Sequence, residues 1–346
     1  MDHEKAAEEF FDNLLKKGAA EPIVDTKLDY PPWFDEQLYD RGRHSALKYA
    51  GLFFGFAFFG LQAAAGIETI AKIFICTKQS TTPKMAYKRY LLNAVHTSTW
   101  YKNKLRPNSE AWLSFEIIQN YHRRANKICS RHNAGFINQK DLAMTQFLLI
   151  GMFCLDGFVK KVDDKEFLDA TMHCWRTFGH FLGIKDEFNM CAGTWDECKP
   201  RFQIAMDRIV KPVLENPGEN NYQFLVKPMI EGLRPMNLFW TYDACLFINK
   251  WLAGCDNCQY FESDYKEGVE VKEKFSEYNK LGWYDKLYVS QLCWSVYLSY
   301  HFVFFRYILN FIAILANVFF FSLPLLGMWR YGYKWAYIKL NKPHGI

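Results

Sequence analysis

The sequence lacks the short motifs that identify the common nucleotide-dependent and hydrolytic enzymes. It has no Gly-x-Gly-x-x-Gly loop, no Walker loop and no Gly-x-Ser-x-Gly elbow. None of the nine histidines has a glutamate three residues before it, as the Glu-x-x-His pairs of a di-iron bundle require. The histidines are also too scattered for a membrane desaturase. These absences exclude several large enzyme classes.

Strong charge of one sign, glycosylation sequons and paired cysteines are also lacking. The 42 basic and 37 acidic residues leave a net charge of only +5, and no basic tract indicates a nucleic-acid partner. There is no Asn-x-Ser/Thr sequon, and residues 1–30 are not typical of a secretory signal. The only Cys-x-x-Cys, at Cys255 and Cys258, cannot complete a four-ligand zinc site. We interpret it as a local turn.

Apolar and aromatic residues are abundant instead. Half of the chain is hydrophobic, and it contains 31 phenylalanines and 11 tryptophans. This composition is ample for a core and exceeds what a plain core needs. It therefore predicts a large apolar cavity, contact with lipid, or both.

The periodicity is helical almost throughout, and alternation typical of strands is nearly absent, so we predict an all-α fold. We expect one large helical domain at 31–300 around an apolar cofactor pocket, preceded by an amphipathic and extended segment at 1–30. Within the domain, residues 50–66 form an apolar block of about 17 residues, against the ~20 that a membrane span needs. Its glycines and alanines favour a buried core helix, and a span stays open. Further helices are expected at 83–104, 109–131, 142–159, 163–183, 200–216, 221–253 and 273–300.

Residues 307–329 carry no charged side chain and are flanked by aromatic residues. This pattern predicts a C-terminal transmembrane helix followed by a basic tail at 330–346, with a buried core helix as the alternative. The positive-inside rule places the tail in the cytosol, which would put the main domain across the membrane. The conflict disappears if residues 50–66 also span, if the rule fails, or if residues 307–329 lie on the membrane surface.

The predicted helix at 109–131 carries the best candidate ligand. Steps of three and four residues place Phe115, Ile118, His122, Ala125 and Cys129 on one stripe, so His122 is expected to face the interior. A hydrogen-bonded structural histidine fits the same spacing. In a helical protein with scattered histidines, a cofactor held by one imidazole, such as haem, remains compatible.

Four segments, in order, resemble the rubber-oxygenase (latex clearing protein) and mpaB-type ER-bound oxygenase family. They are residues 51–66 followed by Pro83 and Arg89, the run Ile118-Gln-Asn-Tyr-His-Arg-Arg-Ala, residues 138–145, and residues 175–183. The likeness covers roughly residues 35–240. It implies an all-α protein with a b-type haem that uses dioxygen on a long apolar, prenyl-type chain. It also implies attachment to the membrane of the endoplasmic reticulum.

Carried over residue by residue, the resemblance implies the following roles. His122 matches the proximal ligand of the haem iron, Arg89 the distal-side arginine, and Thr145 a residue lining the haem. Glu68 is loosely matched to a pocket carboxylate acting as a base. Arg123 or Arg124 could pair with the propionates, with a solvent-exposed arginine as the alternative.

The chain departs from the family pattern at three positions. Asn93, assigned to the cofactor site, stands where a distal threonine is expected. Gln119 and Asn126 occupy positions where rubber oxygenases carry arginines. The leading hypothesis is a haem b-dependent oxygenase acting with dioxygen on an isoprenoid- or lipid-like substrate at a membrane. The alternative is a non-catalytic, membrane-bound protein that keeps the fold and binds lipids or partners.

Overall fold

The described part of the chain is helical, which confirms the all-α prediction. The computed structural model describes residues 3–24, 27–155, 165–218, 220–237, 239–256, 258, 260, 276–317 and 324–337. Over these residues there is no β-strand, only one isolated bridge between Pro22 and Asn138. The elements of the first half are α1 (His3–Asn13), η1 (Leu14–Gly18), α2 (Glu36–Lys48), α3 (Ala50–Ala64), α4 (Glu68–Cys76), α5 (Pro83–Lys102), α6 (Glu110–Arg131) and α7 (Gln139–Leu155).

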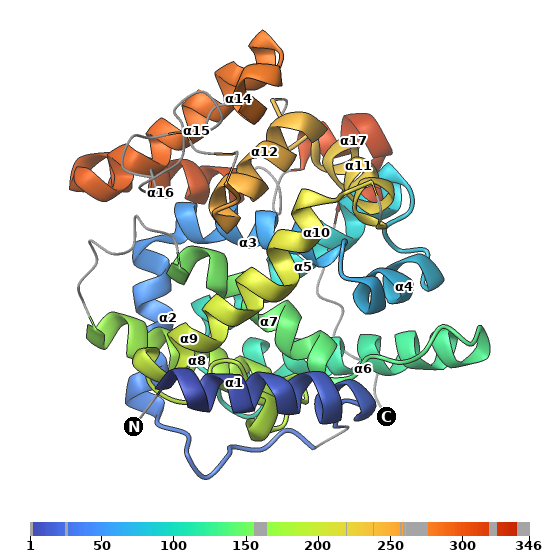
Figure 1. Ribbon diagram of the computed structural model, residues 1–346, viewed down its shortest axis with the longest axis vertical. Coiled ribbons are helices and arrows are strands. Elements are labelled where there is room, and N and C mark those ends of the chain that lie inside the picture. The colour runs from blue at the N-terminus through green and yellow to red at the C-terminus, as the bar shows by residue number, and fades with distance from the viewer. Residues whose placement is uncertain are drawn as a thin grey trace.

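The second half continues the same pattern (Figure 1). Its elements are α8 (Lys165–Phe181), η3 (Asp186–Phe188), α9 (Trp195–Ala205), η4 (Met206–Val210), α10 (Lys211–Glu215), α11 (Tyr222–Leu233), α12 (Tyr242–Ala253), α14 (Ser276–Lys280), α15 (Trp283–His301), α16 (Val303–Asn317), α17 (Leu325–Tyr331) and α18 (Tyr333–Ala336). The expected helix starts at 163 and 273 and the expected end at 159 fall outside the described residues.

Local capping explains why several helix bounds agree with the sequence. The Thr82 side chain accepts a hydrogen bond from Met85 N ahead of Pro83, and Ser109 accepts one from Trp112 N. The expected helix at 221–253 is instead two helices. It breaks after Leu233, where Pro235 follows and interrupts the helical hydrogen bonds.

Glycines allow two pairs of core helices to approach closely. A Cβ at Gly42 of α2 would lie 2.1 Å from the carbonyl oxygen of Ala170 on α8. A Cβ at Gly60 of α3 would lie 1.8 Å from the carbonyl oxygen of Leu148 on α7. Most of α3 is buried, so the block at 50–66 forms a core helix, as its small residues favour.

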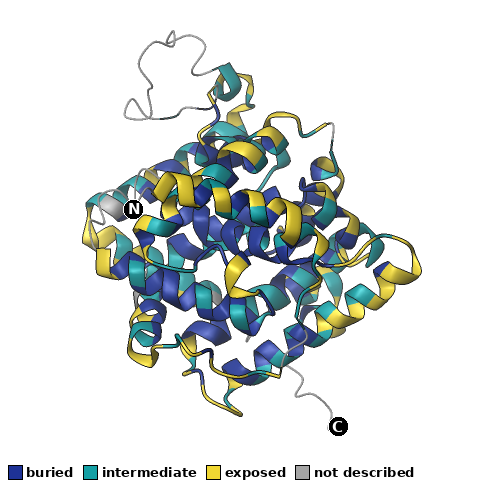
Figure 2. Cartoon of the chain, turned by 60° about the horizontal axis from the view of Figure 1, so that its bottom comes forward, coloured by how far each residue is buried: buried dark blue, intermediate teal, exposed yellow. Residues whose placement is uncertain are grey.

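Aromatic side chains fill the space where α5, α6 and α8 meet. Trp100 stacks on Phe115 with ring centroids 4.5 Å apart, and Phe178 lies 5.2 and 5.7 Å from these two rings. In Figure 2 the buried residues gather inside the bundle, and the exposed ones follow its outer helices. Part of the aromatic excess therefore packs the core.

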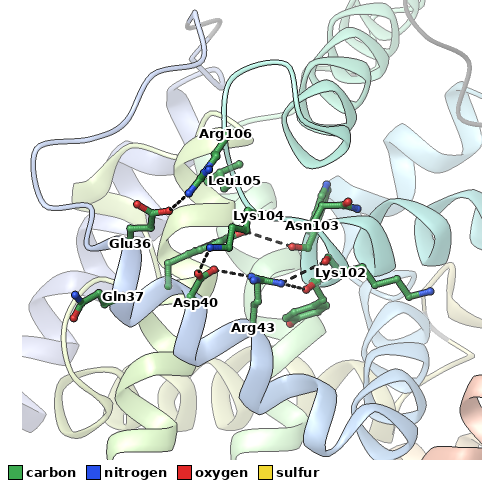
Figure 3. A network of polar contacts seen from close by, with 12 residues as sticks. Glu36, Gln37, Asp40, Arg43, Lys102, Asn103, Lys104, Leu105 and Arg106 are labelled. Atoms are coloured by element: carbon green, nitrogen blue, oxygen red, sulfur yellow. Dashed lines mark hydrogen bonds and ion pairs between the residues drawn. The ribbon is translucent and has the colours of Figure 1, made fainter.

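A polar network joins α2 to the end of α5 (Figure 3). Arg43 is only 4% exposed, and its Nε donates to Asp40 at 2.8 Å. Its Nη1 donates to the carbonyl oxygen of Tyr101 at 2.9 Å and to that of Lys102 at 3.4 Å. One guanidinium thus satisfies the last carbonyls of α5, which have no partner within the helix.

No described helix is both long enough and apolar enough to cross a membrane alone. Only α2 and α3, bent by 91°, pass a test of length and composition together. The expected single span at 307–329 is not found: α16 ends at Asn317, α17 begins at Leu325, and residues 318–323 lie outside the described part. The 15 described residues of α16 extend over about 22 Å. Residues 338–346 of the expected basic tail also lie outside it.

Replacing Gly60 by alanine should destabilise the fold, because the new methyl group would collide with the α7 backbone. We expect a loss of about 2–3 kcal/mol in the free energy of unfolding. At Gly55, also on α3, a Cβ would meet nothing within 4 Å, so Gly55→Ala should be neutral or stabilising by up to ~1 kcal/mol. Denaturant unfolding of both variants checks this, and equal effects would contradict the close approach.

Arg43→Met should cost about 3 kcal/mol, because it leaves buried carbonyl groups and the Asp40 carboxylate without their donor. The matched control is Lys104→Met, since Lys104 pairs with the same Asp40 at 3.8 Å but has a side chain 55% exposed. We expect the control to change stability by less than about 1 kcal/mol. Thermal unfolding of the two variants measures the difference.

Candidate functional site

The candidate site lies where α4, α5 and α6 meet. Helix α6 follows α5 after a short connection, and its inward stripe runs from Phe115 through His122 to Cys129. The Phe115 ring packs against Trp100 and Phe181 in the aromatic core. Burial, then a hydrogen bond with the Cys76 thiol of α4, raises the pKa of Cys129 to about 11. His122 lies between these two anchored positions.

His122 is a half-buried residue whose ring nitrogen Nδ1 is fully buried and has no hydrogen-bond partner. Burial, and secondly the positive charge of Arg89, lowers the pKa of His122 to about 4. The imidazole is therefore neutral at pH 7. A neutral imidazole is the form that binds a metal.

Arg89 of α5 is the charged group that the structure brings to His122. Its Nη1 donates to the Ser80 hydroxyl at 3.2 Å, and its guanidinium lies 4.0 Å from the ring centroid of Phe74 on α4. Burial lowers the pKa of Arg89 from its ordinary value. Arg89 and His122, two of the residues selected from the sequence, thus share one partly desolvated environment between α5 and α6.

Asn93 lies on α5 one turn after Arg89 and is half-buried. Its carbonyl oxygen accepts a hydrogen bond from the Thr97 hydroxyl at 3.0 Å. The next turn of α5 carries His96, so Arg89, Asn93 and His96 follow one another along one side of the helix. Asn93 is thus placed between the two positions that carry a cation and an imidazole.

His96 is a second buried imidazole that the sequence analysis did not select. It is 1% exposed, its Nδ1 lies 2.6 Å from the Ser114 hydroxyl of α6, and its Nε2 is buried without a hydrogen-bond partner. Burial lowers the pKa of His96 to about 4. The spacing 89–93–96–100 along α5 could have indicated it, because these positions share one helix face.

Glu68 does not fit the role of a pocket base. Its side chain is 74% exposed at the start of α4 and forms an ion pair with Lys72 at 2.6 Å. This hydrogen bond and the charge of Lys72 lower the pKa of Glu68, whereas a general base near neutral pH needs a raised one. The short apolar sequence around Glu68 gave no information about which side of α4 faces solvent.

Thr145 and Arg123 are also occupied elsewhere. The Thr145 hydroxyl donates to the carbonyl oxygen of Asp141, one turn earlier on α7, at 2.8 Å. Arg123 is exposed, and its Nη2 donates to the Asn120 side chain at 2.5 Å. The exposed position of Arg123 agrees with the solvent-facing alternative.

Asp141 is the buried carboxylate that sequence reasoning missed. It is 3% exposed, accepts a 2.5 Å hydrogen bond from the Thr69 hydroxyl of α4, and has an Oδ2 without a hydrogen-bond partner. Burial raises the pKa of Asp141 despite the nearby Lys140. In the sequence Asp141 is indistinguishable from an ordinary acidic residue in a first helical turn.

The two departures from the family pattern on α6 have structural uses. Gln119 donates to the carbonyl oxygen of Phe181 on α8 at 2.9 Å. Asn126 accepts a hydrogen bond from Ile137 N at 2.7 Å. Both amides tie α6 to neighbouring segments, so these positions serve packing here.

Within the described residues, no three His, Cys, Asp or Glu side chains are grouped to hold a metal ion. A polar cavity of about 300 Å³ lies between α12, α14 and α15, lined by Asp243, Lys250, Glu277, Lys280 and Asp285 among others. Its charged lining does not suit an apolar cofactor. Cys258 N donates to the carbonyl oxygen of Cys255 at 3.2 Å, which confirms the local turn expected there.

The two buried imidazoles should make the fold sensitive to acid. Their pKa values lie below the ordinary 6.5, so the stability they permit is complete above about pH 6.5 and is lost as the pH falls toward 4. We expect roughly 2–3 kcal/mol per imidazole at pH 4. His122→Gln should remove its share of this pH dependence, measured as the free energy of unfolding at several pH values. Imidazole NMR signals that titrate near 6.5 would contradict the burial.

Comparison of the chain with family models, with curated proteins and with solved structures found no match. The family resemblance therefore rests on the four sequence segments. What the site can do rests on the geometry around His122 and Arg89.

Proposed function

We propose that the chain is a haem b-dependent oxygenase that acts with dioxygen on an apolar, isoprenoid- or lipid-like substrate. The observation that carries this proposal is the buried, partnerless Nδ1 of a neutral imidazole on the inward stripe of α6. Burying a polar nitrogen without a partner costs free energy, so a group that uses this imidazole accounts for its position.

The residues around His122 fit a haem at two points. His122 would bind the iron through its imidazole, and Arg89 would offer a guanidinium to a propionate. Phe74 and Ser80 hold that guanidinium in place, since one lies against its face and the other accepts its hydrogen bond. When bound, the haem iron would supply the activation of dioxygen. Glu68, Thr145 and Arg123 do not fit, and no role is derived for them.

An apolar substrate of this kind partitions into membranes, so we propose that the chain works at one. The family resemblance points to the membrane of the endoplasmic reticulum. The apolar segment at 307–329, whose described part includes most of α16, would attach the chain to this membrane.

The second candidate is a non-catalytic protein that keeps the fold and binds lipids or partners at a membrane. It is favoured by the structural use of Gln119 and Asn126 and by the exposed position of Glu68. This candidate predicts that binding of an apolar ligand does not depend on His122.

Detergent-purified full-length chain supplied with haem should show a Soret band and a b-type pyridine haemochrome. His122→Ala should weaken haem binding by about 100-fold, or ~3 kcal/mol, or abolish it. His132→Ala is the matched control, because His132 is exposed at the end of the same helix. A colourless protein after reconstitution would contradict the proposal.

A further variant separates the two buried imidazoles. His96→Ala should leave the Soret band in place, although burial makes its nitrogen a competing candidate. If His96→Ala removes the band and His122→Ala does not, the ligand assignment is wrong.

A further inference from the structure

We propose that α15 and α16 dock the protein in the plane of a membrane, with the apolar face of α16 inserted among the lipids of an anionic bilayer surface. The helices would lie along the membrane and would not cross it. This inference does not depend on haem binding, because α15 and α16 lie side by side at the opposite end of the molecule from α6 (Figure 1).

Helix α16 is amphipathic in the reverse sense to a helix of a soluble protein. Its polar residues face the protein: Asn310 donates to the carbonyl oxygen of Lys48 at 2.6 Å and accepts from Gly51 N at 3.1 Å. Arg306 donates to the Tyr49 hydroxyl at 3.1 Å. The apolar residues face outward, where water would normally meet a polar face.

The outward side chains are large and highly exposed. On α16, Phe304 is 70% exposed, Phe311 60% and Ile314 60%. Helix α15 adds Trp283 at 79% and Leu287 at 56%. Of the 24 exposed large hydrophobic side chains in the described residues, 17 lie between residues 283 and 333. So strong a concentration marks a surface that is covered in use.

Charge identifies a membrane as the cover. From residue 286 to the end, the sequence contains six basic side chains and no acidic one. This segment therefore accounts for all of the net charge of +5. Four of these six residues follow α16; of the other two, Lys286 lies on α15 beside Asp285, and Arg306 is turned to the protein. An excess of basic residues in the sequence around an apolar, aromatic helix is typical of helices that lie at an anionic lipid surface.

The same charge argues against a second copy of the chain on this surface. A two-fold dimer would bring two identical patches together, and each brings an excess of basic residues, because Asp285 is the only acidic residue in the sequence from 283 onward. A lipid surface supplies the missing negative charge. It also accepts apolar side chains without any matching shape.

The contacts of α16 decide between lying along the membrane and crossing it. Asn310 and Arg306 hold one side of the helix against the start of α3, and Leu309 lies where a side chain at Gly51 would clash. A spanning helix would have to leave these contacts and expose the Asn310 and Arg306 side chains to lipid.

The first test is flotation of the full-length chain with vesicles of phosphatidylcholine that contain phosphatidylserine. Phe311→Glu/Ile314→Glu should reduce the bound fraction about ten-fold, because both side chains point away from the protein. The matched control is Phe136→Glu/Phe224→Glu, at positions 41% and 54% exposed on other parts of the surface. Undiminished binding of the α16 variant, or failure of the wild-type chain to bind, would overturn the proposal.

The second test distinguishes lying along the membrane from crossing it. Asn279→Cys and Lys334→Cys place exposed thiols before α15 and after α17, against a background of nine buried native cysteines and one half-buried. In sealed vesicles, a membrane-impermeant maleimide should label both without detergent. Labelling of Lys334→Cys only after detergent is added would show a span and overturn the proposal. Light scattering that shows a stable lipid-free dimer, with the α16 variant monomeric, would assign the surface to a second copy.

Discussion

The arrangement depends on the close approach of helix backbones at the centre of the bundle. Where Gly60 of α3 meets the Leu148 carbonyl of α7, no room exists even for a methyl group. Gly42 allows the same contact between α2 and α8. These contacts fix the direction in which α3 starts, and α3 in turn holds α16 through Gly51 and Asn310. The core packing therefore also decides which side of α16 is left outside.

Helices α5, α6 and α7 each carry a polar group that is costly to bury. Two imidazole nitrogens, on His96 and His122, and one oxygen of Asp141 are enclosed without hydrogen-bond partners, although buried polar atoms normally find them. Burial, and secondly the charge of the desolvated Arg89 beside it, lowers the pKa of His122 and keeps the imidazole neutral. Groups with strongly shifted pKa values cluster at functional sites. The neutral imidazole beside a cation is therefore the chemical centre of the proposed oxygenase.

Aromatic side chains serve two physical ends in this chain. Between α5, α6 and α8 they interlock as a dense core in which Trp100, Phe115 and Phe178 lie ring against ring. On α15 and α16 they point outward from helices whose polar groups are turned to the protein. The first use excludes water from the neighbourhood of the site. The second suits the lipid surface that we propose for α15 and α16.

The sequence by itself determined the all-α class, the limits of α5 and α6 and the inward direction of His122. These follow from caps such as Thr82 and Ser109 and from a period of 3.6 residues, which act within a few residues of chain. Only the tertiary structure decided that Arg89 lies beside His122, that Glu68 faces solvent and that Asp141 is buried. It also placed α16 against the start of α3, through Asn310 and Gly51. Each of these outcomes depends on which residues, distant in the sequence, pack against a helix. The pattern of residues within one helix does not identify those partners.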